Sequence, residues 1–531
     1  MGIPSYFSYI VRNHRSILIE YKKKKMTINN LYMDCNSIIY DIVNELEKNK
    51  TNILNIEEEI INMVCNKIKY YIKLIKPTSN IYIAFDGVAP VAKMSQQKNR
   101  RYKTNYEEKI LSSMGVNKNK IFNTICITPG TAFMNKLNVK IKETFNNSDK
   151  YNVKKIIIST SDQYGEGEHK IYEYIRNNKN EHTDTTTVIY GLDADLIMLT
   201  LNHLHIAPGM YLFRETPYFI KSIDNTLNPN DNYLLNIPEF ASVLARDLND
   251  SKPDPNNSRI FDYIFLCFLL GNDFLPHFPS LNIRTTGIDR IMDAYKNVLG
   301  NSNNNIIKND KINWNMLRKI ILLLSKTEEN MLIEEYQIRA KQSKSITHRK
   351  LEIEDKLQSI PMLDRSIELY INPYENGWRE RYYQELFNIK IDDNRCKELC
   401  INYLEGLEWT YKYYKDNCND WKWRYKYNYP PLLSDLVRYI PSFDTDFINK
   451  QNKPVHSLTQ LIYVLPENSL YLIPDNLKQK VLEKYNTHYN TELIIEWSFC
   501  RYLWEAHIKV KEMNIDSIER LVANYIKNKT I

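Results

Sequence analysis

Short apolar runs of strand length alternate with helical patterns through the first part of the chain. The clearest strand candidates are Leu31–Met33, Ile81–Phe85, Lys155–Ser159 and Val188–Tyr190. Each run is followed by a turn or a polar cluster and then by apolar residues at helical spacing. Such alternation predicts an α/β fold with a mostly parallel sheet covered by helices on both faces. In such a sheet a ligand site lies at the carboxyl ends of the strands.

The hydrophobic pattern changes after residue 299. Residues 300–355 begin with the polar stretch NSNNNIIKND and continue with apolar positions at helical spacing, which predicts a linker and one long, partly exposed helix. Residues 356–531 are mainly helical in pattern and rich in aromatic residues. We therefore predict an N-terminal α/β domain over 1–299, a connecting part over 300–355 and a helical region over 356–531.

Composition fits a soluble, intracellular protein. A chain of 531 residues is too long for one typical core. It has no long uncharged apolar run and no signal-peptide layout at its N-terminus, so we expect no membrane association. Its eight scattered cysteines complete no zinc site and indicate free thiols in a reducing compartment. The net charge of +7 is too mild to indicate nucleic-acid binding by itself.

Acidic residues follow each strand candidate. They are Asp34, Asp86, Glu166, Glu168, Asp193 and Asp195, and Asp273 follows a further apolar helix that ends at a glycine. Each acid alone is more often a helix cap. Together, however, they would meet at one sheet edge, where clustered carboxylates repel each other unless cations neutralise them.

A divalent-metal site is the natural resolution of such an acidic cluster. Oxygen ligands favour Mg²⁺, with Mn²⁺ as the alternative, and two ions can activate water for phosphodiester hydrolysis. The sequence contains no GxSxG, HExxH or GxxxxGK[ST] motif that would point to a competing chemistry. We therefore predict that the seven acids are metal-binding and catalytic.

A basic helix follows Asp86. The stretch GVAPVAKMSQQKNRRYK predicts a helix that begins near Pro90. Its spacing places four donors on one face, namely Lys93, Gln97, Arg100 and Arg101. Arginine offers planar paired contacts to phosphate and lysine a point charge. A solvated basic face is the alternative, but the neighbouring Asp86 favours a phosphate pocket.

Long motifs identify a family resemblance over nearly the whole chain. In the first part they are MGIPSYFSYI, LYMDCNSIIY, YIAFDGVAPVAKMSQQKNRRYK, GEGEHKIYEYIR, YGLDADLIML and FLLGNDFLPHFP. In the second half they are NPYENGWRERYYQELF and EGLEWTYKYYKDNCNDWKWRYKYNYPPLLSDL. Through these stretches the chain resembles the XRN family of 5′→3′ exoribonucleases. The resemblance implies a PIN/FEN-like nuclease domain and a mostly helical second region that closes the active site to all but single-stranded RNA.

The resemblance also implies roles for particular residues. It gives the seven acids the metal-binding role and gives Lys93, Gln97, Arg100 and Arg101 the pocket for an RNA 5′ phosphate. The family usually has histidine where this chain has Tyr40, a position expected to stack on the terminal base. The opposing ring is expected from Trp409, Trp421 or Trp423. A core-packing role is the alternative for Tyr40 and for at least two of the tryptophans.

The functional hypothesis is removal of 5′-mononucleotides from 5′-monophosphorylated single-stranded RNA with two Mg²⁺ ions. This would place the protein in mRNA decay after decapping or endonucleolytic cleavage, with decapping or other RNA-decay factors as partners and the cytoplasm favoured over the nucleus. The cytoplasmic members of the family carry large additional C-terminal domains. Since these do not occur here, we expect a self-sufficient core or a substituting partner, and the oligomeric state stays open.

Two other functions fit parts of the pattern. A structure-specific flap DNA endonuclease would share the acids but not the KMSQQKNRR face or the motifs of the second half. A non-catalytic RNA-binding scaffold would share the fold, but all seven acids are present, and degenerate nucleases usually lose some of theirs. Divalent-dependent release of mononucleotides distinguishes both from the exoribonuclease.

Overall fold

A seven-stranded sheet organises the first part of the chain. The computed structural model describes residues 3, 5–23, 26–49, 53–116, 120–191, 193–215, 220–229, 231–249 and 258–529. The sheet order is β1-β7-β6-β5-β2-β3-β4. The strands are β1 (Leu18–Glu20), β2 (Asn30–Asp34), β3 (Asn80–Ala84), β4 (Lys155–Ser159), β5 (Thr187–Tyr190), β6 (Met210–Arg214) and β7 (Tyr233–Asn236).

The sheet is mostly parallel, as the sequence predicts. Strand β2 pairs in parallel with β3 and β5, and the parallel pairing continues to β4 on one side and β6 on the other. Strand β7 pairs antiparallel with β6 and β1. The four predicted strands are all present and differ from the prediction by at most one residue at each end. Strands β1, β6 and β7 were not predicted.

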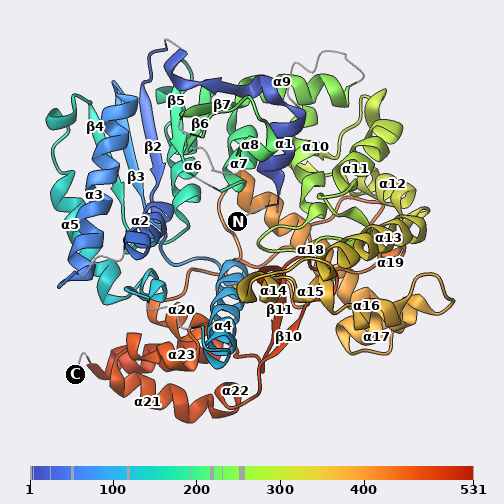
Figure 1. Ribbon diagram of the computed structural model, residues 1–531. Coiled ribbons are helices and arrows are strands. Elements are labelled where there is room, and N and C mark those ends of the chain that lie inside the picture. The colour runs from blue at the N-terminus through green and yellow to red at the C-terminus, as the bar shows by residue number, and fades with distance from the viewer. Residues whose placement is uncertain are drawn as a thin grey trace.

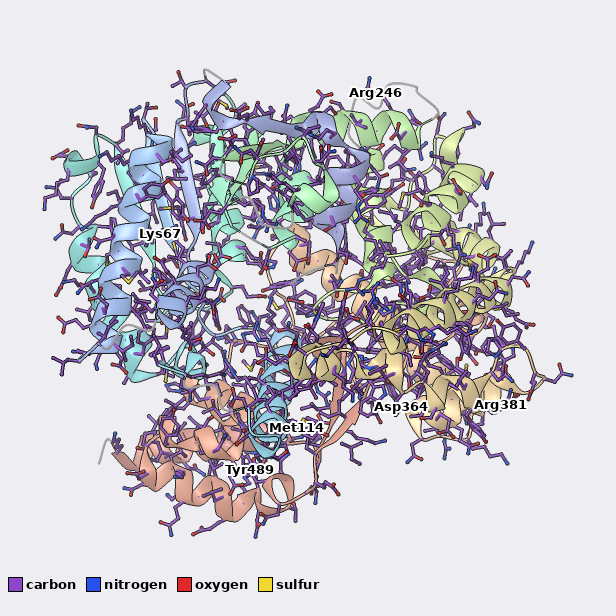
Figure 2. The ribbon with its side chains drawn as sticks, viewed as in Figure 1. Lys67, Met114, Arg246, Asp364, Arg381 and Tyr489 are labelled. Atoms are coloured by element: carbon purple, nitrogen blue, oxygen red, sulfur yellow. The ribbon has the colours of Figure 1, made fainter. Side chains whose placement is uncertain are left out.

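Helices cover both faces of the sheet because successive strand residues point to opposite sides. Leu31 and Met33 of β2 pack in one core with α2 (Asn36–Asn49), α3 (Ile56–Ile75) and α5 (Ala132–Thr144). Tyr32, between them, packs in a second core on the other face. The helices of that face are α1 (Tyr6–Asn13), α6 (Gly167–Asn177), α7 (Asp195–His203), α9 (Ile237–Leu248) and α10 (Ser258–Cys267). Lys67 on α3 and Arg246 on α9 mark the two helix layers in Figure 2.

The second core continues into the helical region. It includes residues of α11 (Gly287–Tyr295), α12 (Trp314–Ser325), α18 (Asp393–Lys415) and α19 (Leu433–Tyr439). The single long helix predicted within 300–355 is wrong. The stretch forms a short hairpin, β8 (Ile307–Lys308) and β9 (Lys311–Ile312), followed by α12 and by α13 (Glu328–Thr347). A turn at Lys326 and Thr327 separates the two helices, and the apolar side of α12 is buried in the core rather than exposed.

Helix α4 (Val91–Ser113) projects from the sheet towards the C-terminal part of the chain (Figure 1). It packs on α20 (Ser457–Val464) and β11 (His507–Lys509). In Figure 2, Met114 marks the far end of α4, and Tyr489 marks the C-terminal helices beside it. These helices are α21 (Asp475–Lys484), α22 (Asn486–Tyr489) and α23 (Ile515–Lys529). The helix that carries the predicted phosphate pocket is therefore held by residues more than 350 positions later in the chain.

The remaining elements complete the helical region. They are α14 (Ile353–Gln358), α15 (Ile360–Leu363), α16 (Ser366–Ile371), α17 (Trp378–Phe387) and β10 (Ile494–Glu496), which pairs with β11. In the N-terminal part, the short helix α8 (Ile220–Ile223) packs on α1. Among the described residues, none of the helices combines the length and the apolar character needed to span a bilayer. The predicted architecture, a mostly parallel sheet with helices on both faces joined to a mostly helical region, is confirmed.

Candidate active site

The seven predicted acids gather at the carboxyl edge of the sheet. Asp34 is the last residue of β2, Asp86 follows β3 and Asp193 follows β5. Glu166 immediately precedes α6, Glu168 lies in its first turn, and Asp195 begins α7. Asp273 follows Gly271, whose positive φ of 83° ends the helical segment after α10. The structure thus brings acids from five separate segments into one cluster, in which their charges influence one another.

Asp86 is held in a fixed orientation. Asn36 Nδ2 donates to Asp86 Oδ2 at 2.6 Å, and the Asp86 backbone N–H donates back to Asn36 Oδ1 at 3.1 Å. The backbone N–H of Gly167 donates to Asp86 Oδ1 at 2.7 Å. These bonds tie β3 to the start of α2 and to the first turn of α6.

Gly167 allows two acids to approach the first turn of α6. A Cβ atom at this position would lie 2.6 Å from Asp34 Oδ1 and 3.5 Å from Asp86 Oδ1. Since real Cβ atoms do not approach other atoms to 2.6 Å, any other residue would displace Asp34. Glycine here is therefore required by the position of the acids rather than by its own backbone conformation.

Burial and mutual repulsion perturb the cluster. Burial and the charges of Asp86 and Asp193 raise the pKa of Asp34. Burial and the charge of Asp273 raise the pKa of Asp195 to about 7. One oxygen on each of Asp34, Glu168 and Asp195 is buried and has no hydrogen-bond partner within the described ranges. Buried polar atoms without partners are rare in native proteins, and a bound ion or water would satisfy these oxygens.

Lys93 lies inside the acidic cluster. Its Nζ is 2.5 Å from Glu166 Oε2 and 2.7 Å from Asp273 Oδ2. Burial alone would lower the pKa of Lys93, but these carboxylates outweigh it and raise that pKa. Burial would likewise raise the pKa of Asp273, and the Lys93 ammonium holds it below its usual range. Lys93 thus contacts the acids directly, whereas Arg101 and Gln97 form hydrogen bonds with other residues.

The donor set fits a hard divalent cation. As the side chains stand, no three acidic, histidine or cysteine groups of the described residues converge on one ion position, and the Lys93 ammonium lies between Glu166 and Asp273. All the same, the cluster offers only oxygen ligands, and three of these oxygens lack partners in the described structure. Oxygen donors of this kind are the ligands that Mg²⁺ and Mn²⁺ prefer.

The basic face of α4 contains a buried guanidinium. Arg101 is 7% exposed, and its Nη2 donates to Thr128 Oγ1 at 2.7 Å. Its Nη1 is buried and has no partner among the residues that the structure describes. Burial lowers the pKa of Arg101 to about 10. Gln97 accepts a hydrogen bond from Gln460 of α20, whereas Arg100 is exposed.

Helix α18 contributes hydroxyl groups to the acids. Tyr413 donates to Glu166 Oε1 at 2.8 Å, and its ring stacks on His169 at 3.7 Å between centroids. Tyr414 donates to Asp195. The sequence interpretation missed both residues. From the aromatic run around them, the sequence predicts only stacking rings and does not indicate that tyrosine hydroxyls bind the acids.

The tryptophans divide into core and site residues. Trp409 is 2% exposed and stacks between Tyr413 and Trp423, with centroid distances of 4.9 and 5.1 Å. With both ring faces covered, it has a core role and cannot stack on a base. Trp421 is half-buried, and its carbonyl accepts from Val91 N–H at the start of α4. Its ring lies 6.5 Å from Tyr164, an exposed residue just before Glu166 that sequence reasoning missed.

Tyr40 lies on α2 next to the phosphate face. It is half-buried and packs against the core between the sheet and α3. It is close enough to Arg101 to influence the pKa of that guanidinium. A ring here can contact both the core and a ligand of Arg101.

An acidic cluster at the carboxyl edge of a mostly parallel sheet, covered by a second, helical region, defines a PIN-like nuclease domain. The family model described as "XRN 5'-3' exonuclease N-terminus" matches residues 1–216. The model described as "Xrn1 helical domain" matches residues 256–369 and 365–516. Together these matches cover most of the chain, and the protein belongs to the XRN 5′→3′ exonuclease family.

Named relatives match nearly the whole chain. It is 27% identical to "5'-3' exoribonuclease 1" of Saccharomyces cerevisiae over 99% of this chain and 43% of the yeast protein. It is 27% identical to "5'-3' exoribonuclease 2 homolog" of Drosophila melanogaster over 90% of this chain and 65% of that protein. It is 28% identical to "5'-3' exoribonuclease 1" of Schizosaccharomyces pombe over 89% of this chain and 44% of that protein. The chain thus spans between about two fifths and two thirds of the length of these relatives.

Proposed function

We propose that the protein is a 5′→3′ exoribonuclease that removes 5′-mononucleotides from 5′-monophosphorylated single-stranded RNA. One observation carries the proposal. Through Lys93, helix α4 reaches the acids whose buried oxygens lack a partner in the described part of the chain. Two turns further on, the same helix carries Arg101, whose buried Nη1 likewise has no partner among those residues. The first group suits metal ions and the second an anion such as a terminal phosphate. The family and the names of the relatives support the same reaction.

The seven acids would hold two divalent ions, Mg²⁺ or Mn²⁺. When bound, such ions supply an activated water for in-line attack on the first phosphodiester and stabilise charge on the leaving oxygen. Asn36 and the Gly167 N–H orient Asp86, and Tyr413 orients Glu166. The ion pairs of Lys93 with Glu166 and Asp273 keep a positive charge beside the acids while the 5′ phosphate binds.

The remaining residues would select the substrate. Gln97, Arg100 and Arg101 face the 5′ phosphate, and Tyr40 and Trp421 stack on the terminal base. The second region covers the acids through α18, which favours a single strand over a duplex. Because a capped or triphosphorylated end fits such a pocket poorly, the enzyme would act after decapping or endonucleolytic cleavage, as an intracellular mRNA-decay enzyme working with decapping or other decay factors.

One assay tests this function. RNAs with 5′-monophosphate, 5′-hydroxyl and capped ends are each incubated with the protein in Mg²⁺ or in EDTA. Mononucleotide release is expected only from the monophosphorylated RNA in Mg²⁺. Equal degradation of all three ends, or cleavage of a DNA flap in preference to RNA, would contradict the proposal.

Replacing Gly167 by alanine is expected to lower the hydrolysis rate about 100-fold, because the new methyl group displaces Asp34 by a fraction of an ångström to about 1 Å. The melting temperature and RNA binding in EDTA should change little. The control is Glu173→Ala, which changes an exposed residue on the same helix, α6. Wild-type rates for both variants would show that the position of Asp34 does not limit the reaction.

Tyr40→Ala is expected to lose about 1–3 kcal/mol of base stacking, whereas Tyr40→Phe and Tyr40→His keep a ring and most activity. The loss should appear as partly degraded RNA released during a single binding event, measured by product length against a trap. Tyr70→Ala, an exposed tyrosine on α3, is the control. A lower melting temperature with unchanged product lengths would assign Tyr40 to packing instead.

A further inference from the structure

A second cavity lies on another face of α4. It has a volume of about 680 Å³ and is lined on the helix by Ala92, Ser95, Gln96, Lys98, Asn99, Arg100 and Lys103. Except for Arg100, which the sequence assigns to the phosphate face, these positions lie on other sides of the helix than Lys93, Gln97 and Arg101. The opposite walls are the loop 270–277, which carries Asp273, and parts of 424–428 and 496–512. The cavity therefore borders the acidic cluster at Asp273 and the phosphate face at Arg100.

Lys98 is the most informative residue in this cavity. It is 6% exposed, and its Nζ has no hydrogen bond or ion pair with any residue that the structure describes. Its Nζ lies 5.1 Å from the ring centroid of Tyr463 and 5.7 Å from that of Tyr102. Burial and the charge of Arg424 lower the pKa of Lys98 to about 7. Without an anion beside it the buried amine loses its proton easily, and a negatively charged ligand at Lys98 would stabilise the ammonium form.

Two other cavity-lining groups are buried without partners in the described part of the chain. One is Nδ2 of Asn272, and its orientation is fixed because Asn272 Oδ1 accepts from the N–H groups of Phe274 and Leu275. The other is Oε1 of Gln96. A donor and an acceptor are thus available beside the ammonium. Together they match a ligand that carries both hydrogen-bonding edges and an anionic group.

The rest of the lining suits a nucleotide. The rings of Tyr425, Tyr427 and Phe387 line the cavity, and bases stack on such rings irrespective of sequence. Lys426 adds an exposed positive charge that forms no ion pair among the described residues. The volume lies within the range of about 300–1,000 Å³ that is typical of small-molecule sites. It therefore fits a free nucleotide better than a long RNA strand.

We propose that this cavity binds a nucleoside 5′-monophosphate, with Lys98 at its phosphate, and serves as the site that the cleaved nucleotide occupies on leaving the acidic cluster. The inference rests on the proposed function, since that reaction would produce this ligand beside Asp273. A separate product site lets the shortened RNA stay on the other face of α4 while the nucleotide leaves.

The test measures binding of AMP and UMP to the whole chain in EDTA, so that no turnover is needed. The phosphate face is first saturated with a 5′-phosphorylated phosphorothioate RNA. One nucleotide per chain is still expected to bind, and adenosine and uridine, which lack the phosphate, should bind at least about tenfold more weakly. Exclusion of AMP and UMP by the bound RNA would mean that the active site alone binds nucleotides and would overturn the proposal.

Lys98→Met is expected to weaken AMP binding about tenfold or more and to leave RNA binding unchanged. Lys426→Glu, at an exposed position, should also weaken AMP binding without affecting the fold. The control is Lys109→Met, which changes an exposed lysine on the same helix outside the cavity. Unchanged AMP binding in Lys98→Met and Lys426→Glu, or weaker RNA binding in its place, would overturn the assignment.

The same variants separate this inference from the proposed function. If the wild-type protein binds AMP beside bound RNA but does not degrade RNA, the exoribonuclease proposal fails while the cavity assignment stands. If the protein degrades RNA, AMP added to the reaction should inhibit Lys98→Met less than wild type. Equal inhibition of the two proteins would contradict a product site at Lys98.

Discussion

Asp195→Asn is expected to lower RNA hydrolysis by about 1,000-fold or more while the protein stays folded. The amide keeps the shape of the side chain but removes the charge from one of the buried oxygens that lack a partner in the described structure. Losing an ion ligand removes several kcal/mol of transition-state stabilisation, and about 1.4 kcal/mol corresponds to a tenfold change in rate. Single-turnover rates on 5′-phosphorylated RNA, measured over a series of Mg²⁺ concentrations, check this.

The same substitution, Asp195→Asn, is not expected to lower the stability of the fold. Burial and the charge of Asp273 raise the pKa of Asp195, so Asp195 is unfavourably charged in the ion-free protein at neutral pH. Asp195→Asn should therefore keep or raise the melting temperature in EDTA. Asp444→Asn, at an exposed position, is the control for both measurements. A folded Asp195→Asn protein with wild-type turnover would rule out this metal site.

Arg101→Ala is expected to reduce the preference for 5′-monophosphate over 5′-hydroxyl RNA by about 10- to 150-fold. This corresponds to roughly 1.5–3 kcal/mol for one desolvated, charge-assisted contact. The buried Nη1 of Arg101 is the donor that would make the contact. The measurement is kcat/KM on the two RNAs, because the variant should slow the phosphorylated substrate and leave the hydroxyl substrate nearly unchanged.

Two further variants sharpen the result. Arg101→Lys keeps the charge but not the planar fork, so its preference should lie between those of wild type and Arg101→Ala. Arg246→Ala removes an exposed arginine on α9, far along the chain from this face, and should behave as wild type. If wild-type protein degrades both RNAs equally, the pocket is assigned wrongly.

The sheet was predictable where apolar runs are followed by helical patterns. Strands β2 to β5 meet this condition, and their parallel order places the acids at one edge. Strand β1 has three residues, too few for a periodic signal. Strand β7 runs directly into α9, so its apolar residues merge with the pattern of that helix. The division of one long apolar pattern into α12 and α13 depends on which side of α12 is buried, and tertiary packing decides that.

For the site, the acids could be located along the chain but their contacts could not. The pairing of Lys93 with Glu166 and Asp273 depends on how α4 is oriented against the sheet, which helical spacing does not specify. The hydrogen bond from Tyr413 to Glu166 joins residues 247 positions apart. Neither residue's local pattern indicates the other, so this part of the site emerged only from the fold.

The start of α4 depends on distant residues, and this affects when the enzyme becomes active. Ala89 N–H donates to Gln460, 371 positions later, and Val91 N–H donates to the Trp421 carbonyl. At synthesis rates of about 5–20 residues per second, the ribosome needs roughly 20–70 s to make the intervening chain. A nascent or prematurely terminated polypeptide therefore carries most of the acids without a fixed phosphate face. The proposed nuclease activity is therefore expected only after residue 460 has been synthesised and has folded onto α4.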